Sequence, residues 1–126
     1  MEGRMYTVGI DMTTISRIEK SLSKKGFAQF VYGNRELELF YGEKPKFSSL
    51  AANFSAKEAL GKALGTGVRN FELSEVQVLR TEQGKPYFVF SGKALKIMED
   101  KGYTAEISLS HEGDFAIAMV ILQSPI

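Results

Sequence analysis

Residues 54–67 read FSAKEALGKALGTG, and this stretch decides how the middle of the chain folds. Its apolar and small residues recur at helical spacing, and the pattern extends back to Ser48 or Ser49, either of which could open a helix. The glycines of residues 65–67 are a strong stop, because glycine readily adopts the left-handed conformation that ends helices. The sequence therefore predicts one long helix that ends near Leu64.

On the N-terminal side of this helix, apolar and polar residues alternate from Tyr6 to Asp11. A period of two is typical of a strand, and it puts Asp11 at the strand's C-terminal end. Two helices are expected next, one capped by Thr13 or Thr14 and ended by residues 24–26, and one capped by Asn34 and reaching about residue 41.

On the C-terminal side the pattern changes to short strands. We expect strands at 76–79 and 87–90 around a turn, a short helix from Ser91 to Gly102, and strands at 105–110 and 115–122. The last strand is continuously apolar, which predicts burial on both faces. The order of elements predicts an α+β fold, a single domain over residues 1–126 with helices covering a mostly antiparallel sheet.

Composition excludes several classes of function. The 126 residues carry a net charge of +1, so no basic field indicates nucleic acid binding. There are no cysteines, which excludes disulfides, thiolate nucleophiles and cysteine-based metal sites. Residues 1–5 lack an apolar signal core, and the longest apolar run, 115–122, is too short to span a bilayer. We expect a soluble, cytoplasmic protein.

Asp11, Glu58 and Lys62 are candidates for chemistry. A strand-end carboxylate such as Asp11 is costly to bury unless paired or bound to a metal, although Asp11 could also cap the next helix. Glu58 lies on a largely small or apolar helix face, so we expect it to be partly buried, either paired with Lys62 at i+4 or in a functional site. Two carboxylates beside a lysine suit magnesium on a diphosphate, because magnesium takes oxygen ligands and completes its shell with water and phosphate.

His111 is the only histidine and follows Ser110 at a strand end. A hydroxyl and an imidazole at that position could hold a phosphate, although a hairpin histidine is often only a surface residue. The glycine motifs at 65–67 and 84–86 are ambiguous caps or turns, and the chain contains no G-x-x-x-x-G-K-[ST] phosphate loop. One histidine among many serines supports no catalytic triad.

Together, these blocks resemble the bacterial holo-acyl-carrier-protein synthases, the small trimeric class of 4′-phosphopantetheinyl transferases. The resemblance extends from about Val8 to Leu122, and four ordered blocks carry it: GID at 9–11 with RI at 17–18, FSAKEA at 54–59 with KALGTG at 62–67, GKPY at 84–87, and SLSHE at 108–112. It implies a 4′-phosphopantetheinyl transferase-like fold and a homotrimer with sites between subunits.

The resemblance also implies roles for single residues. Asp11 and Glu58 match magnesium ligands, and Lys62 matches a lysine that contacts the phosphates of coenzyme A. Gly65, Thr66 and Pro86 match segments that line the nucleotide site. Ser110 and His111 match the region near the nucleotide 3′-phosphate. Arg17 matches a basic residue on the helix that docks the acidic carrier protein.

Two places depart from the family pattern. Asn53 stands where the family usually has an arginine, which removes one expected phosphate contact. Residues 28–33 are more apolar than usual and lack a basic residue near Phe30 and a threonine near Gly33, which predicts altered docking of the carrier protein.

The implied activity is transfer of 4′-phosphopantetheine from coenzyme A to a serine of apo acyl-carrier protein in fatty acid biosynthesis, with release of adenosine 3′,5′-bisphosphate. Glu58, Asp11 or a metal-bound water could accept the serine proton, and the sequence does not choose among them. The alternatives are a coenzyme A-binding module without transferase activity, a magnesium-dependent phosphohydrolase, and a purely structural α+β domain.

Overall fold

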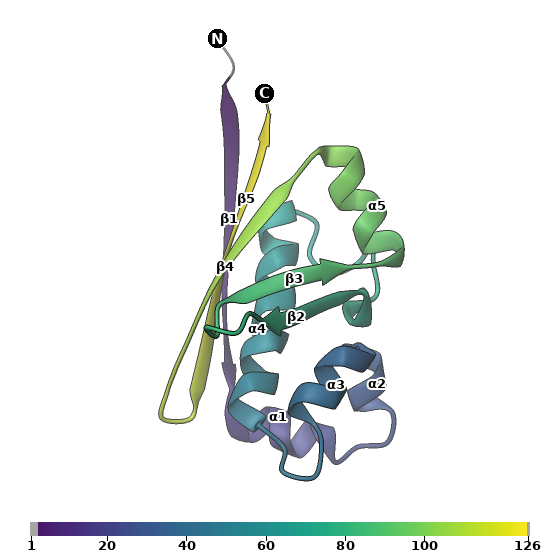
Figure 1. Cartoon of the computed structure of the whole chain (residues 1–126), viewed down its shortest axis with the longest axis vertical. Helices are drawn as coiled ribbons and strands as arrows, with labels where there is room; N and C mark the ends of the chain where they lie inside the picture. Colours follow the sequence, from purple (N-terminus) through teal and green to yellow (C-terminus); the bar gives the residue numbers. More distant parts are fainter. Residues whose placement is uncertain (1–2, 126) are drawn as a thin grey trace.

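The computed structural model describes residues 3–125, so Met1, Glu2 and Ile126 of the expected 1–126 domain lie outside the described residues. The long helix α4 (Phe47–Leu64) packs along one face of a three-stranded sheet (Figure 1). The sheet has the order β1 (Arg4–Thr14), β5 (Phe115–Pro125), β4 (Thr104–Glu112), and both strand pairs are antiparallel. This arrangement confirms the α+β fold class and the long central helix.

The remaining strands form a second sheet rather than joining the first. The hairpin of β2 (Val76–Arg80) and β3 (Pro86–Phe90) contacts α4 through β2 and β4 through β3. The short helices α1 (Ile15–Leu22), α2 (Phe27–Val31) and α3 (Asn34–Phe40) lie near the start of α4, and α5 (Gly92–Lys101) lies beyond β3 (Figure 1). A 3₁₀ turn, η1 (Leu73–Glu75), precedes β2. The strands therefore form two sheets where one was expected, and α2 was not predicted.

Strand β1 continues past the predicted end. Its partner β5 supplies pairing along the whole strand, with Asp11 opposite Ala118 and Thr14 opposite Phe115. Asp11 therefore lies inside a strand rather than at its end. No helix among residues 3–125 has the length and apolar character needed to cross a bilayer.

The start of α1 is held by a residue from the far end of the chain. Thr14 precedes the helix but makes no side-chain cap bond, and Thr13 belongs to β1. Instead, Asp114 in the β4–β5 turn accepts bonds from the Ser16 backbone N–H (3.0 Å) and hydroxyl (2.6 Å). The expected threonine cap is therefore wrong, because a carboxylate that is distant in sequence satisfies these donors.

The two faces of the three-stranded sheet differ. Small residues allow α4 to lie directly on one face, and a Cβ at Gly9 would collide with the backbone carbonyl of Ala59. On β5 this face is fully buried, whereas Phe115, Ile117 and Met119 on the opposite face are 37–49% exposed. The expectation that both faces of β5 are buried is wrong for the single chain.

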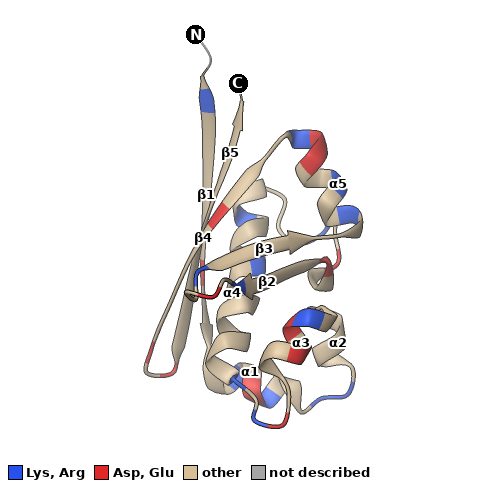
Figure 2. Cartoon of the chain, viewed as in Figure 1, with Lys and Arg blue, Asp and Glu red and all other residues tan. Residues whose placement is uncertain are grey.

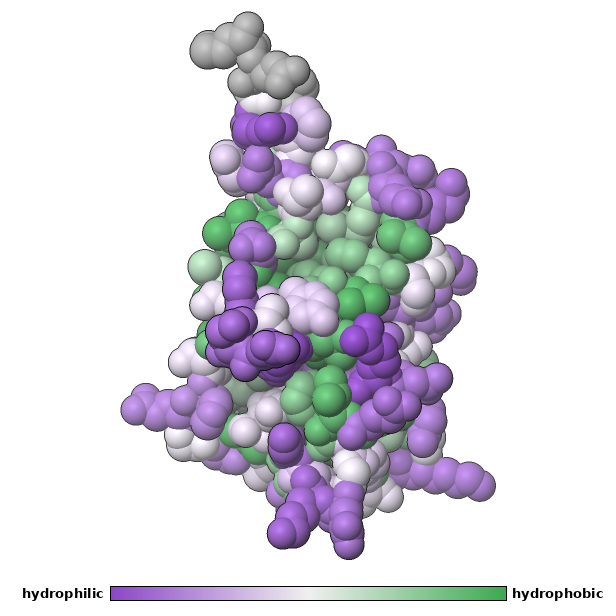
Figure 3. Space-filling model, viewed as in Figure 1, coloured by the Kyte–Doolittle hydropathy of each residue, from purple (hydrophilic) through white to green (hydrophobic). Residues whose placement is uncertain are grey.

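We call the uncovered side the bare sheet face. Its main apolar residues on β1 are 57–62% exposed, and they are Tyr6, Val8, Ile10 and Met12. The central strand β5 carries no charged residue (Figure 2). Figure 3, in the view of Figure 1, shows hydrophobic residues at the left border of the molecule, where this sheet runs. A large apolar surface of this kind marks an interaction site.

Candidate functional site

The structure brings Asp11 and Glu58 to one cleft of about 260 Å³ beside the β1 edge of the sheet. Strand β1 contributes Asp11, helix α4 contributes Glu58, and helix α1 contributes Arg17. Phe54 from α4 also lines the cleft. Two carboxylates that are 47 positions apart in sequence thus share one cavity wall, as the magnesium hypothesis requires.

The electrostatics of this cleft favour a cation. Glu58 is half-buried, as expected, and burial raises its pKa, with a further rise from the nearby Asp11 carboxylate and an opposing effect of Lys62. Among residues 3–125, no group of three or more histidine and acidic side chains could hold a metal. Two carboxylates are nevertheless a suitable donor set for magnesium, which takes one or two carboxylates and completes its shell with water and substrate phosphate.

Lys62 contacts Asp11 rather than Glu58. Its ammonium donates to Asp11 Oδ1 (3.1 Å) and to the carbonyl of Ile10 (2.9 Å). Within residues 3–125 its ion pair is with Asp11, so the i,i+4 pair with Glu58 is wrong. The Lys62 side chain is 57% exposed, and an exposed pair of this kind contributes only about 0–1 kcal/mol. Lys62 can therefore leave Asp11 for a phosphate at little cost.

Asp11 does not cap a helix. Its Oδ2 accepts a bond from the Thr13 hydroxyl (3.4 Å), and that hydroxyl accepts one from Ser55. The first turn of α1 is satisfied by Asp114 instead. The capping interpretation of Asp11 is therefore wrong, and one of its oxygens contacts Lys62 while the other contacts Thr13.

Three of the other predicted residues gather in a second cleft of about 190 Å³. It contains Pro86, Ser110 and His111, together with Arg80 and the first-turn serines of α4. Sequence reasoning missed Arg80, since one arginine at the end of a short strand carries no signal. The sequence analysis considered Ser48 and Ser49 only as residues that could begin the long helix. Gly65 and Thr66 line neither cleft; they close α4, where Gly65 adopts φ +80°.

The two clefts lie at opposite edges of the three-stranded sheet. Asp11 on β1 stands opposite Ala118, which stands opposite Leu109 on β4, so the two edges are about 10 Å apart at normal strand spacing. Ala118 between them is fully buried. Helix α4 packs on β1 and β5 and contributes Glu58 to the first cleft and Ser48 and Ser49 to the second, which we call the serine cleft. One chain thus presents two partial sites.

Asn53 is buried rather than at the surface. Its amide donates to Glu36 (2.9 Å) and to the Val78 carbonyl (3.0 Å), and its oxygen accepts a bond from Arg80 (2.8 Å). A guanidinium from β2 therefore lies beside the position where the resemblance leads us to expect one from α4. Phe30, by contrast, is 64% exposed on α2.

Comparisons with known proteins agree on one family. A family model described as the 4′-phosphopantetheinyl transferase superfamily matches residues 7–120. A holo-[acyl-carrier-protein] synthase of Fusobacterium nucleatum subsp. nucleatum is 44% identical over 117 residues, covering 91% of this chain and 96% of that protein.

Solved structures match over similar lengths. The holo-[acyl-carrier-protein] synthase of Neisseria meningitidis has a TM-score of 0.82 at 32% identity, covering 92% of this chain and 96% of that one. The enzyme of Bacillus anthracis, in complex with CoA (3′,5′-ADP), has a TM-score of 0.79 at 30% identity, covering 97% and 99%. The match to residues 7–120 spans Asp11, Glu58 and His111.

Proposed function

The chain belongs to the 4′-phosphopantetheinyl transferase superfamily, and from that premise we propose that it transfers 4′-phosphopantetheine from coenzyme A to a serine of apo acyl-carrier protein. Adenosine 3′,5′-bisphosphate is the other product. The observation that carries the proposal is the cleft that Asp11 and Glu58 both line, with Lys62 bonded to Asp11. Residues 1–126 would act as a single cytoplasmic domain in fatty acid biosynthesis.

Asp11 and Glu58 would hold magnesium in this cleft, since their mutual repulsion favours a cation between them. When bound, the ion supplies positive charge to the diphosphate of the donor. Arg17 lines the same cleft from α1, so an acidic carrier protein that contacts α1 would bring its serine to the site.

In the reaction, the serine oxygen forms a bond to the phosphorus that bears pantetheine, and the bond from that phosphorus to the bridging oxygen breaks, so that this oxygen leaves with adenosine 3′,5′-bisphosphate. The serine proton passes to Glu58, Asp11 or a water molecule. Lys62 moves its ammonium from Asp11 to the diphosphate, where it neutralises charge. The protein thereby positions the two reactants and stabilises charge, which is the main contribution of protein groups to phosphoryl transfer.

A mass measurement tests this function directly. The chain is incubated with coenzyme A, magnesium and an apo carrier protein, and the carrier is expected to gain the mass of phosphopantetheine. Binding of coenzyme A without that gain would favour a binding module. Free phosphopantetheine released without the carrier would favour a phosphohydrolase, and no binding of metal or nucleotide would favour a structural domain.

Replacing Lys62 with alanine is expected to lower kcat/KM for coenzyme A by roughly 10- to 100-fold, the loss typical of one charged hydrogen bond. Steady-state kinetics at saturating carrier protein measures the change. Lys96→Ala is the control, because Lys96 forms an exposed pair with Asp100 on α5. Unchanged rate and coenzyme A affinity in K62A would remove Lys62 from the site.

We also propose a homotrimer in which each complete site combines the β1-edge cleft of one chain with the β4-edge cleft of the next. The two partial sites at opposite sheet edges support this arrangement, because neither has all the candidate residues. The bare sheet face supports it as well, since contact between copies would cover its apolar side chains.

Placing a charge on the bare sheet face is expected to break the assembly. Val8→Lys would bury an unpaired ammonium in any contact between copies, so we expect a monomer with transfer at least tenfold slower. Light scattering after size-exclusion chromatography measures the mass. Leu95→Lys, an exposed position on α5, is the control. A wild-type monomer with full activity would contradict the proposed trimer.

A further inference from the structure

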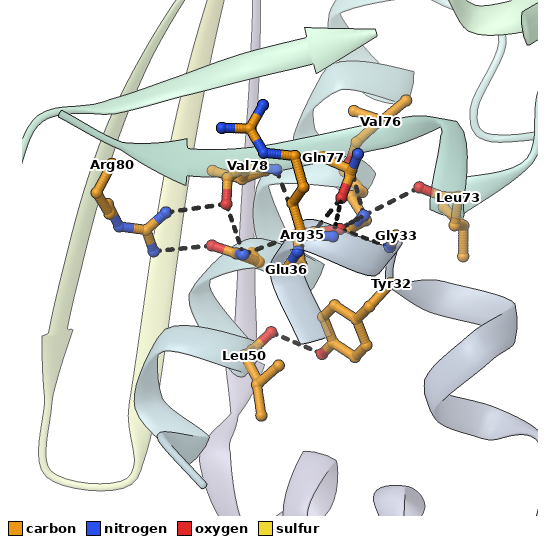
Figure 4. A network of polar contacts seen from close by, with 12 residues as sticks. Tyr32, Gly33, Arg35, Glu36, Leu50, Leu73, Val76, Gln77, Val78 and Arg80 are labelled. Carbon is orange, nitrogen blue, oxygen red and sulfur yellow. Dashed lines mark hydrogen bonds and ion pairs between the residues drawn. The ribbon is translucent and has the colours of Figure 1, made fainter. Parts of the chain in front are cut away.

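Helix α4 carries buried polar side chains on two sides. Toward β2, Lys57 bonds to Glu36 and to two backbone carbonyls, in the network around Glu36 that Figure 4 shows. Toward β1, the Ser55 hydroxyl donates to the Thr13 hydroxyl. Ser55 is fully buried and Thr13 is only 7% exposed. This hydroxyl pair therefore joins, out of reach of bulk water, the two elements that carry the carboxylates of the first cleft.

The direction of the bonds in this hydroxyl pair is set by Asp11. The Thr13 hydroxyl lies 3.4 Å from Asp11 Oδ2, and an ionised carboxylate can only accept hydrogen bonds. The hydrogen of Thr13 is therefore directed at Asp11, and Thr13 accepts the hydrogen of Ser55. Ser55 thus orients Thr13, and Thr13 orients Asp11.

The two side-chain partners of Asp11 differ in how firmly they are held. Lys62 lies 3.1 Å from Oδ1, and its side chain is 57% exposed. In the proposed reaction Lys62 moves to the diphosphate, so it leaves Asp11 while the donor is bound. Thr13 is fixed in the paired part of β1, opposite Ala116, and stays where it is. The hydroxyl pair is therefore the restraint on Asp11 that lasts through the reaction.

We propose that Thr13 and Ser55 are positioning residues that keep Asp11 oriented for magnesium after Lys62 has moved to the donor. This inference rests on the proposed function, in which Asp11 holds the ion. Loss of a group that orients a metal ligand typically costs roughly 10- to 100-fold in metal affinity. Because the bond from Thr13 to Asp11 is long, we expect the lower end of that range.

Thr13→Val tests the proposal, because valine keeps the shape of the side chain and lacks the hydroxyl. Calorimetry with coenzyme A present and no carrier protein should show a Kd for magnesium about 10-fold above that of the wild type. Thr13→Ser keeps the hydroxyl and should bind magnesium as the wild type does. Adding Ser55→Ala to T13V should weaken binding no further, because Ser55 acts through Thr13.

Thr7→Val is the matched control. Thr7 lies on the same strand and the same side of the sheet as Thr13, since the two are six positions apart. Its hydroxyl oxygen is buried and has no hydrogen-bond partner among residues 3–125. Thr7 lines neither the first cleft nor the serine cleft. The same change of side chain in T7V should therefore leave the Kd for magnesium at the wild-type value.

Transfer kinetics distinguish a positioning role from damage to the fold. Raising the magnesium concentration should bring kcat of T13V to within about twofold of the wild type. A loss that magnesium does not recover would overturn the proposal, as would an unchanged Kd in T13V or equal losses in T13V and T13S. If the wild type binds magnesium and coenzyme A without transferring the group, the proposed function fails, and the Kd of T13V still decides the role of Thr13. A wild type that binds no magnesium would overturn both.

Discussion

Replacing Glu58 with glutamine is expected to lower the rate of phosphopantetheine transfer by at least about 10²-fold at limiting magnesium, the loss typical when one charge-stabilising group is removed from an active site. Glutamine keeps the size of the side chain and removes its charge. The wild-type cleft holds two carboxylates, and burial, with a further contribution from the Asp11 carboxylate, raises the pKa of Glu58. With one charge removed, the cleft attracts a divalent cation less strongly.

Two measurements check this expectation. Transfer is followed by the mass gain of the carrier across a magnesium titration, and magnesium binding is followed separately by calorimetry in the presence of coenzyme A. Glu38→Gln is the control, because Glu38 is exposed on α3 and lines neither cleft. A wild-type rate for E58Q at limiting magnesium would contradict the assignment of Glu58 as a metal ligand.

Local signals predicted the long helix α4 well and strand ends poorly. Helix α4 begins at Phe47, one residue before Ser48, and ends at the predicted Leu64, because helical periodicity and a following glycine are both local properties. The end of β1 depends instead on β5, which is about a hundred residues away in sequence and continues to pair with β1 as far as Thr14. No pattern within residues 6–14 contains that information.

The faces of the sheet show a second limit of sequence reasoning. Alternation in β1 correctly predicted a strand, and the usual rule buries its larger apolar residues. In the single chain the reverse holds, because α4 needs the small residue Gly9 beneath it and leaves Val8 and Ile10 exposed. If another copy of the chain covers this face, Val8 and Ile10 become buried and β1 follows the usual rule.

The candidate site was predicted in part. Asp11 and Glu58 line one cleft, which a shared role requires, while Ser110 and His111 lie at the other edge of the sheet. Arg80 could not be found from the sequence, since its relevance depends on the Asn53 amide that orients it. The buried position of Asn53 likewise follows from the packing of α4 against β2, which one residue type does not reveal.

The largest effect on stability is expected at Glu36. Replacing it with glutamine leaves the Lys57 ammonium fully buried without a counter-charge, and breaking a buried pair in this way costs about 3–5 kcal/mol. The neighbouring acceptors of Lys57 are the Leu73 and Val76 carbonyls, which are neutral and cannot replace a carboxylate. Urea unfolding followed by circular dichroism, at one fixed protein concentration, measures the loss.

A second variant separates charge from packing. Glu36→Gln combined with Lys57→Met removes both charges, so no unpaired ion stays buried. The free energy of unfolding of this double variant should therefore be higher than that of E36Q. Burial lowers the pKa of Lys57 and the Glu36 carboxylate opposes this effect, so removing Glu36 is expected to lower that pKa further. A loss below about 1 kcal/mol in E36Q would contradict the expectation, because it would mean that Lys57 releases its proton once the carboxylate is gone and no unpaired ion stays buried.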